Sequence, residues 1–211
     1  SGAEVKRVSM RSRTTAAVAE EWNKIARTRA RQIESGADRS ARDVLGPAIL
    51  ELLGTDSEVL DVGCGTGWLT AVLARHADHI VGIDPSSKSI ALARRRTKKK
   101  NVMFVQTSIE KFAKTHAEAF SSAVSNMTLV TVSRLPRVVK AVSRCLRPGG
   151  HFTFTIAHPC FWPTYWRYGE ASWFRYQAEI AVSVPFRIAS EQTAYVTTHV
   201  HRPLEQYIAI M

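Results

Sequence analysis

The sequence predicts one α/β domain built around a mostly parallel β-sheet. Short apolar segments of strand length alternate with helical segments from residue 58 to residue 156, and strands joined through helices pair in parallel with right-handed crossovers. A glycine-rich turn at Gly63, Gly65 and Gly67 follows the first of these strands. The chain has 211 residues, enough for one domain with a sizeable core but not for two. We therefore expect a three-layer sandwich with helices on both faces of the sheet.

Two helices are expected before the first strand, within residues 1–53. From Thr14 to Ile33, small and apolar residues recur at helical spacing, and Thr14 or Thr15 can cap the first turn. A second helix is expected from Arg39 to Leu53, and it ends at Gly54 because glycine readily adopts the left-handed conformation that closes a helix.

The core, residues 55–157, reads as five strands with helices between them. The strands are expected at residues 58–62, 79–84, 102–105, 123–126 and 151–156. The helices are expected at residues 67–75, 87–97, 109–114 and 138–146.

The sequence changes character in residues 158–211. Residues 158–176 hold a dense aromatic cluster with little periodicity, two extended segments follow near 180–184 and 194–199, and Pro203 can open a last helix. We expect this part to cover the substrate side of the sheet. The aromatic residues are equally compatible with the roof of a pocket, a packed cover or the contact of a homodimer.

Composition narrows the class of protein. With 45% hydrophobic and 22% charged residues, and no apolar run near the roughly 20 residues that cross a bilayer, the chain has the composition of a water-soluble protein. Three widely spaced cysteines predict neither a disulfide framework nor a metal site, so a reducing cytoplasm is the expected location.

The net charge of +11 favours anionic partners without naming one. The positive charge gathers in the N-terminal region and in a basic knot from Lys88 to Lys100. A basic solvated surface is the favoured interpretation, and nucleic acid is the alternative partner.

The glycine turn is the most specific signal. Its pattern is D-x-G-x-G-x-G, from Asp61 to Gly67, whereas a dinucleotide turn of the form G-x-G-x-x-G would need glycine in place of Trp68. The pyrophosphate of a dinucleotide is therefore not the implied ligand. Asp84, at the end of the second strand, stands where a carboxylate suits the paired hydroxyls of a ribose, and it is also placed to cap the next helix.

At this point the sequence resembles the class I, Rossmann-like S-adenosylmethionine-dependent methyltransferases, with similarity to a bacterial small-molecule branch. The turn at 61–67 carries the resemblance together with three further segments, at 81–86, 123–127 and 144–150. The resemblance covers roughly residues 55 to 158 and implies S-adenosyl-L-methionine as cofactor and S-adenosyl-L-homocysteine as product.

The resemblance implies a role for each residue of the turn. Asp61 and Gly63 would face the methionine part of the cofactor, and Cys64, Gly65 and Gly67 would line the turn beside it. A nucleophilic role for Cys64 is not expected, because no histidine partner stands near it in the sequence.

The resemblance also implies an adenosine subsite. Asp84 would hold the ribose hydroxyls, and Pro85 or Ser86 would border the adenine. Ser108 and Ile109 would meet the adenine ring, although relatives often carry an acidic residue where Ser108 stands.

Three residues are expected near the acceptor or over the cofactor. Asn126 would lie by the methionine carboxylate and the substrate entrance, and Trp22 resembles a position that closes over the cofactor or packs in the core. His158 is the candidate for a catalytic base or substrate contact, with a hydrogen-bonded turn before Pro159 as the competing interpretation.

The expected function is methyl transfer to a small-molecule acceptor, for which specialised metabolism is one setting. The alternatives are an RNA methyltransferase, which the basic knot motivates, and a non-catalytic cofactor-binding module. The non-catalytic module is an alternative because the resemblance implies a further helix and two strands, which the sequence up to Met211 does not supply. The acceptor atom (oxygen, nitrogen or carbon) is left open.

Overall fold

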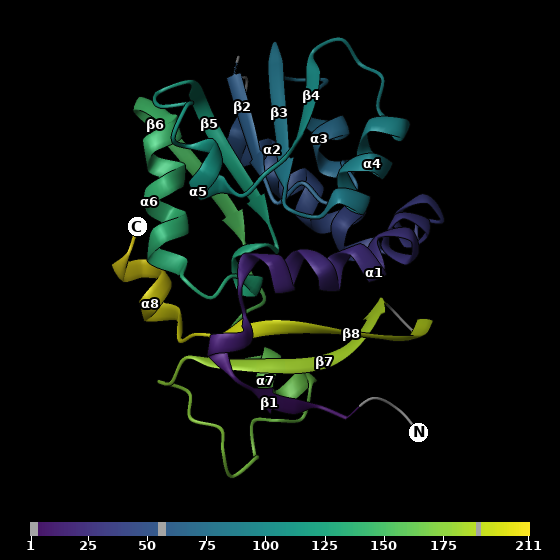
Figure 1. Ribbon diagram of the computed structural model, residues 1–211, viewed down its shortest axis with the longest axis vertical. Helices are drawn as coiled ribbons and strands as arrows, with labels where there is room; N and C mark the ends of the chain where they lie inside the picture. The colour runs from purple at the N-terminus through teal and green to yellow at the C-terminus, as the bar shows by residue number, and fades with distance from the viewer. Residues whose placement is uncertain (1–3, 55–57, 189–190) are drawn as a thin grey trace.

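The computed structural model describes residues 4–54, 58–188 and 191–211 and has two β-sheets on opposite sides of one long helix (Figure 1). The larger sheet has five parallel strands with helices on both faces. The smaller sheet has three antiparallel strands, and helix α1 (Thr15–Glu34) runs between the two sheets. The predicted fold class, an α/β sandwich around a parallel sheet, is confirmed.

The parallel sheet has the strand order β4-β3-β2-β5-β6, which puts the first strand of the core at its centre. Every neighbouring pair is parallel. The strands are β2 (Glu58–Val62), β3 (His79–Asp84), β4 (Val102–Gln106), β5 (Phe120–Asn126) and β6 (Leu146–Thr155).

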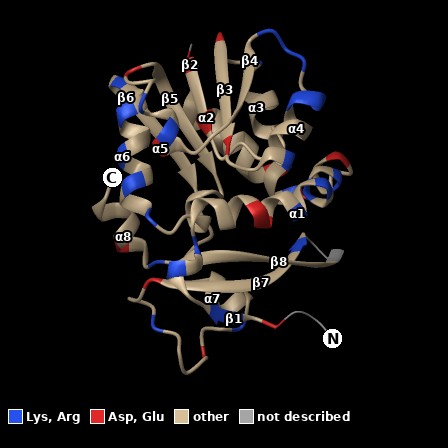
Figure 2. Cartoon of the chain, viewed as in Figure 1, with Lys and Arg blue, Asp and Glu red and all other residues tan. Residues whose placement is uncertain are grey.

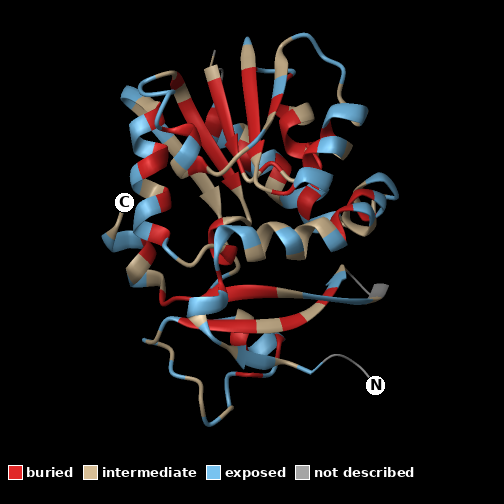
Figure 3. Ribbon diagram, viewed as in Figure 1, coloured by how far each residue is buried: buried red, intermediate tan, exposed pale blue. Residues whose placement is uncertain are grey.

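Side chains of β2 alternate between two hydrophobic clusters, one on each face of the sheet, and the strand is buried along nearly its whole length (Figure 3). Leu60 and Val62 pack in the cluster covered by α5 (Ile109–Phe112) and α6 (Leu135–Cys145). Val59 packs in the other cluster with residues of α2 (Gly46–Leu53) and α3 (Trp68–Leu73). Because both faces are covered, β2 is a nearly continuous apolar run.

Two further helices complete the flanks of the sheet. Helix α4 (Ser87–Arg96) follows β3 and packs against β4, and helix α8 (Leu204–Ala209) adds Tyr207 to the cluster of α5 and α6. Within the described parts of the chain, no helix has both the length and the apolar character needed to cross a bilayer.

The helix predicted over residues 39–53 is two elements in the structure. A π-helical segment, Ser40–Leu45, precedes α2. The strand predicted at 151–156 begins earlier, at Leu146, because Leu146 already pairs with Phe120 of β5; an irregularity in the register separates this pair from the next one, His151 with Ser122.

The smaller sheet joins residues from the two ends of the sequence. Its order is β1-β7-β8, formed by β1 (Lys6–Val8), β7 (Ile180–Ile188) and β8 (Glu191–His201), with antiparallel pairing throughout. The two extended segments predicted near residues 180 and 194 are β7 and β8. They pair with each other and with β1 rather than extending the parallel sheet.

Candidate functional site

A cavity of about 1210 Å³ lies between the carboxyl ends of the parallel strands and the smaller sheet. Its lining includes the ends of β2, β3 and β5 on one side and residues of β7, β8 and α7 (Trp162–Tyr165) on the other. Helix α1 contributes a third wall between them (Figure 1). Ligands of open parallel sheets bind outside the carboxyl ends of the strands, which is the position of this cavity.

The three glycines of the turn serve different purposes. All three have positive φ angles, of 77°, 54° and 80° for Gly63, Gly65 and Gly67. A Cβ atom on Gly63 would lie 2.2 Å from the hydroxyl oxygen of Thr128, and one on Gly67 would lie 2.8 Å from Phe104. A Cβ atom on Gly65 would meet nothing within 4 Å. Gly65 therefore borders open space where a ligand can approach the backbone, whereas the other two glycines permit close packing.

Asp61 and Asp84 place two carboxyl groups beside this turn. Asp61 is 1% exposed and accepts a hydrogen bond of 2.6 Å from the Thr70 hydroxyl. Asp84 accepts from the backbone N–H of Gly65 (3.0 Å) and of Ser86 (2.7 Å). Burial raises the pKa of Asp61 to about 7 and that of Asp84 to about 6. Both residues line the cavity, so a cationic ligand there would favour their charged forms.

The cap of α4 is Ser86 and not Asp84. The Ser86 side chain accepts from the Ser89 N–H (3.1 Å) and donates to Asn23 of α1 (2.8 Å). Ser86 is fully buried and outside the lining of the cavity, whereas Asp84 and Pro85 line it.

The remaining residues predicted around the cofactor fall into the same cavity. Ser108, Ile109 and Asn126 line it, and the Asn126 side-chain oxygen accepts from the Thr155 hydroxyl at 2.6 Å. Trp22 lines it from α1, with its ring edge-on to Phe186 at 6.0 Å between centroids.

Two residues of the turn differ in their relation to the cavity. Cys64 lines it, and burial raises the pKa of its thiol well above the usual range, which keeps the thiol protonated. Gly67 is outside the lining and opens α3.

His158 lies apart from the cavity. It is exposed, its Nδ1 accepts from the Cys160 N–H at 3.3 Å, and it is absent from the cavity lining. This geometry matches the hydrogen-bonded turn that sequence reasoning weighed against a catalytic role.

The histidine that lines the cavity is His199 on β8, which sequence reasoning missed. It is 6% exposed, and its Nε2 lies 3.1 Å from the hydroxyl oxygen of Tyr168. Burial lowers the pKa of His199 to about 3, so its imidazole is neutral at pH 7. Nothing in the local sequence marks it, because its position depends on the pairing of β8 with β7.

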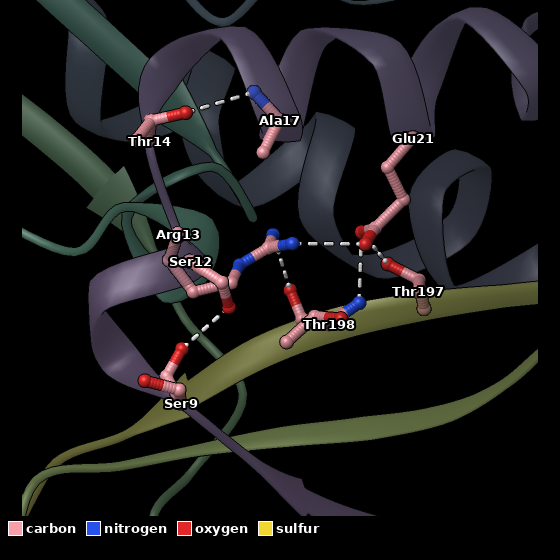
Figure 4. A network of polar contacts seen from close by, with 8 residues as sticks. All are labelled: Ser9, Ser12, Arg13, Thr14, Ala17, Glu21, Thr197 and Thr198. Carbon is pink, nitrogen blue, oxygen red and sulfur yellow. Dashed lines mark hydrogen bonds and ion pairs between the residues drawn. The ribbon is translucent and has the colours of Figure 1, made fainter.

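An ion pair that the sequence did not reveal holds α1 against the smaller sheet (Figure 4). The Arg13 guanidinium donates to the Glu21 carboxylate (2.9 Å) and to the backbone oxygen of Thr198 (3.3 Å). Glu21 in turn accepts from the Thr198 N–H (2.8 Å) and from the Thr197 hydroxyl (3.3 Å). Nearby, the Thr14 hydroxyl accepts from the Ala17 N–H (3.2 Å) and caps α1, as predicted.

The wall opposite the glycine turn is aromatic and basic. Trp162, Tyr165 and Trp166 line the cavity beside Phe186 and Arg187 of β7. The Arg187 guanidinium carbon lies 4.7 Å from the centroid of the Trp166 ring and 5.2 Å from that of Tyr165. Trp162, Tyr165 and Trp166 belong to the aromatic cluster of residues 158–176, for which the sequence analysis considered the roof of a pocket.

Comparison with known proteins agrees with this geometry. The family profile described as a methyltransferase domain matches residues 60–154. A ubiquinone biosynthesis O-methyltransferase of Cronobacter sakazakii is 34% identical over 100 residues, which are 46% of this chain and 41% of that protein. The chain therefore spans less than half the length of this curated relative.

Two solved structures share the fold. One from Listeria monocytogenes, assigned as an S-adenosylmethionine-dependent methyltransferase, has 26% identity and a TM-score of 0.56 over 73% of this chain and 74% of that one. The PH0226 protein of Pyrococcus horikoshii has 22% identity and a TM-score of 0.64 over 82% of this chain and 79% of that one.

The parallel sheet, the glycine turn with its two carboxyl groups and the matched domain agree on one assignment. Residues 60–154 match the methyltransferase domain, and the fold of the chain is that of the class I, Rossmann-like S-adenosylmethionine-dependent methyltransferases.

Proposed function

We propose that this protein transfers a methyl group from S-adenosylmethionine to a small-molecule acceptor bound in the cavity between the two sheets. The observation that carries the proposal is the two-sided lining of that cavity. Its floor is the glycine turn with Asp61 and Asp84, and its opposite wall is the aromatic surface of β7 and α7. A volume of about 1210 Å³ exceeds the roughly 300–1,000 Å³ of typical small-ligand pockets, so it has room for a cofactor and an acceptor together.

The residues of the floor fit the cofactor. Gly65 leaves open space above the backbone, and Asp84 presents a carboxylate beside it for the ribose hydroxyls. Asp61 and Asn126 would hold the methionine end, and Ser108 and Ile109 the adenine. When bound, the cofactor supplies an activated methyl group on a sulfonium.

The protein's own contribution is positioning. Holding two reactants close and aligned can contribute roughly 7–11 kcal/mol to lowering a barrier. Trp22 from α1 and Phe186 from β7 meet over the cavity and would exclude water from it. His199, which is neutral and lines the cavity, is proposed in place of His158 as the histidine that faces the acceptor.

A small acceptor suits the enclosure of the site better than a macromolecule. The cavity is covered by α1 and by the smaller sheet, and the Cronobacter relative is named for O-methylation in ubiquinone biosynthesis. The alignment with that relative covers 46% of this chain and 41% of that protein, so the acceptor of this chain is not inherited from it.

The position of the basic knot relative to the cavity does not support the RNA alternative. The lysines 98–100 lie in the loop between α4 and β4, at the amino end of the strand (Figure 2). The cavity lies at the carboxyl ends of the strands. None of the three lines the cavity.

Calorimetric titration with S-adenosylhomocysteine tests the cofactor site. We expect Asp84→Ala to weaken binding by about 1–3 kcal/mol, because ribose hydrogen bonds to a charged group are lost. Asp78→Ala, at an exposed aspartate outside the cavity, is the control and should bind as the unchanged protein does. Equal affinity of the two variants would overturn the ribose assignment.

A labelled-methyl assay on a panel of small acceptors tests turnover. We expect transfer to at least one acceptor and its loss in Asp84→Ala at cofactor concentrations near the dissociation constant. Tight product binding without transfer to any acceptor, RNA included, would favour the non-catalytic alternative.

A further inference from the structure

The cavity carries an excess of positive charge. Among the residues that the structure describes, seven arginines line it: Arg11, Arg13, Arg29, Arg39, Arg134, Arg137 and Arg187. Three of these are paired with carboxylates, in the pairs Arg13–Glu21, Arg29–Asp38 and Arg39–Asp43. The other four make no ion pair with a described residue.

The carboxylates of the cavity are confined to its cofactor side. Those in the lining are Asp38, Asp61, Asp84 and Glu110, which come from the segments around α1, β2, β3 and α5. Within the described parts of β7, β8 and α7, no acidic side chain lines the cavity. The wall formed by β7, β8 and α7 therefore carries positive charge from Arg187 with no described carboxylate beside it, whereas the cofactor side carries both carboxylates and arginines.

Arg187 is the unpaired arginine with the most defined surroundings. Its guanidinium stacks at 4.7 Å on Trp166, which is 8% exposed, and at 5.2 Å on Tyr165. Stacking restrains the guanidinium plane by cation–π attraction while its N–H groups make no hydrogen bond to a described residue. A restrained guanidinium whose N–H groups have no hydrogen-bond partner among the described residues can bind a carboxylate or a phosphoryl group in bidentate fashion.

We propose that Arg187 binds an oxyanion on the methyl acceptor, so that the acceptor is a small molecule carrying a carboxylate or a phosphoryl group. Arg187 is then a specificity-determining residue, and Tyr165 and Trp166 restrain it. This inference rests on the proposed function, because it takes the cavity as the acceptor site. The remaining unpaired arginines raise the local concentration of such an anion by long-range attraction.

The test uses protein saturated with S-adenosylhomocysteine and three probes at constant ionic strength: benzoate, inorganic phosphate and benzamide, the neutral analogue of benzoate. Intrinsic tryptophan fluorescence reports binding, since Trp166 and Trp162 stand beside Arg187 and Tyr165. We expect saturable binding of at least one anion and binding of benzamide at least about tenfold weaker than that of benzoate, by the loss of a charge-assisted hydrogen bond. Tighter benzoate identifies a carboxylate acceptor, and tighter phosphate identifies a phosphoryl acceptor.

Arg187→Gln should weaken binding of the preferred anion by about tenfold or more and leave product affinity unchanged. Arg187→Lys should restore part of the affinity, because it keeps the charge without the planar fork. Arg7→Gln is the matched control, since Arg7 is an exposed arginine of the same sheet and lies outside the cavity.

The inference is overturned if Arg187→Gln binds the anions as the unchanged protein does, or if benzamide matches benzoate. It is also overturned if neither anion binds while S-adenosylhomocysteine does, and in that case the cofactor assignment stands. Failure of the unchanged protein to bind S-adenosylhomocysteine overturns the proposed function and the inference together.

Discussion

Of the two carboxyl groups beside the glycine turn, that of Asp61 is more deeply buried than that of Asp84. Burial raises its pKa to about 7 in the folded protein, against the ordinary value of 3.8 in an unfolded chain. Between these values the folded state keeps a proton that the unfolded state has released. The contribution of Asp61 to the free energy of unfolding is therefore full below about pH 4 and is lost as pH rises toward 7.

Asp61→Asn should remove this pH dependence while keeping an oxygen that accepts from Thr70. We expect the unchanged protein to lose stability relative to the variant by up to about 1 kcal/mol per pH unit from pH 5 to pH 7. Urea unfolding of both proteins at several pH values measures the difference in their free energies of unfolding. Groups other than Asp61 titrate in both proteins, so their contributions cancel in this difference. Parallel stability curves would contradict the raised pKa.

Gly65 and Gly67 form a matched pair for substitution. Gly65→Ala adds a methyl group at φ 54°, so we expect backbone strain to lower the free energy of unfolding by about 1–2 kcal/mol. The methyl group also occupies the open space where the ligand approaches the backbone, so product affinity should fall at least tenfold. Gly67→Ala adds a clash with Ala93 and Phe104 to the strain and should cost about 2–5 kcal/mol. Thermal unfolding and calorimetric titration distinguish the two. A Gly65→Ala protein with normal product binding would show that the ligand does not approach the turn there.

Sequence reasoning reached the candidate cofactor residues but not the opposite wall of the cavity, formed by β7, β8 and α7. Asp61, Gly65 and Asp84 follow strand ends in a short stretch, so their local order predicts that they converge. His199 and Arg187 converge with them only through the pairing of β7 with β8 and the packing of α7, which no local pattern encodes. His158 was chosen for its place after a strand, and its ring instead closes a local turn with Cys160.

At the scale of elements, the Arg13–Glu21 pair joins α1, which forms one wall of the cavity, to β8. Arg13 is 6% exposed, so Arg13→Met leaves Glu21 without its charged partner in a poorly solvated place. We expect a loss of about 3–5 kcal/mol in the free energy of unfolding, measured with urea. Trypsin should also cleave at the arginines and lysines of residues 6–11 faster than in the unchanged protein. Arg27→Met, at an exposed position of α1 outside the cavity, is the control; equal effects of the two variants would contradict a restraining role.

The strands and helices of the core were predictable because their apolar periods and glycine stops are local. Strand β1 was not, since three residues carry too little pattern, and its partner β7 lies far along the chain. The same limit applies to the smaller sheet as a whole. Extended segments at β7 and β8 could be predicted, but a separate sheet opposite the parallel one could not, because sheet membership depends on long-range packing.

For the molecule as a whole, ligand binding should couple the two sheets. The cavity is lined from both, so S-adenosylhomocysteine should slow amide hydrogen exchange in the turn at 63–67 and also in α1 and β8. Saturation at about 100 times the dissociation constant should add about 2.7 kcal/mol to the free energy of unfolding. Protection confined to the parallel sheet would contradict the coupling of the two sheets by ligand binding.

The pairing of β1 with β7 also has a consequence for biosynthesis. Val8 lies opposite Ala181, so this contact closes a loop that contains the entire parallel sheet. On the ribosome, the parallel strands emerge long before β7 does, and domains form contacts as their sequence becomes available. The nascent protein would thus form the glycine-turn side of the cavity first. The side formed by β7 would follow last, when β1 pairs with β7.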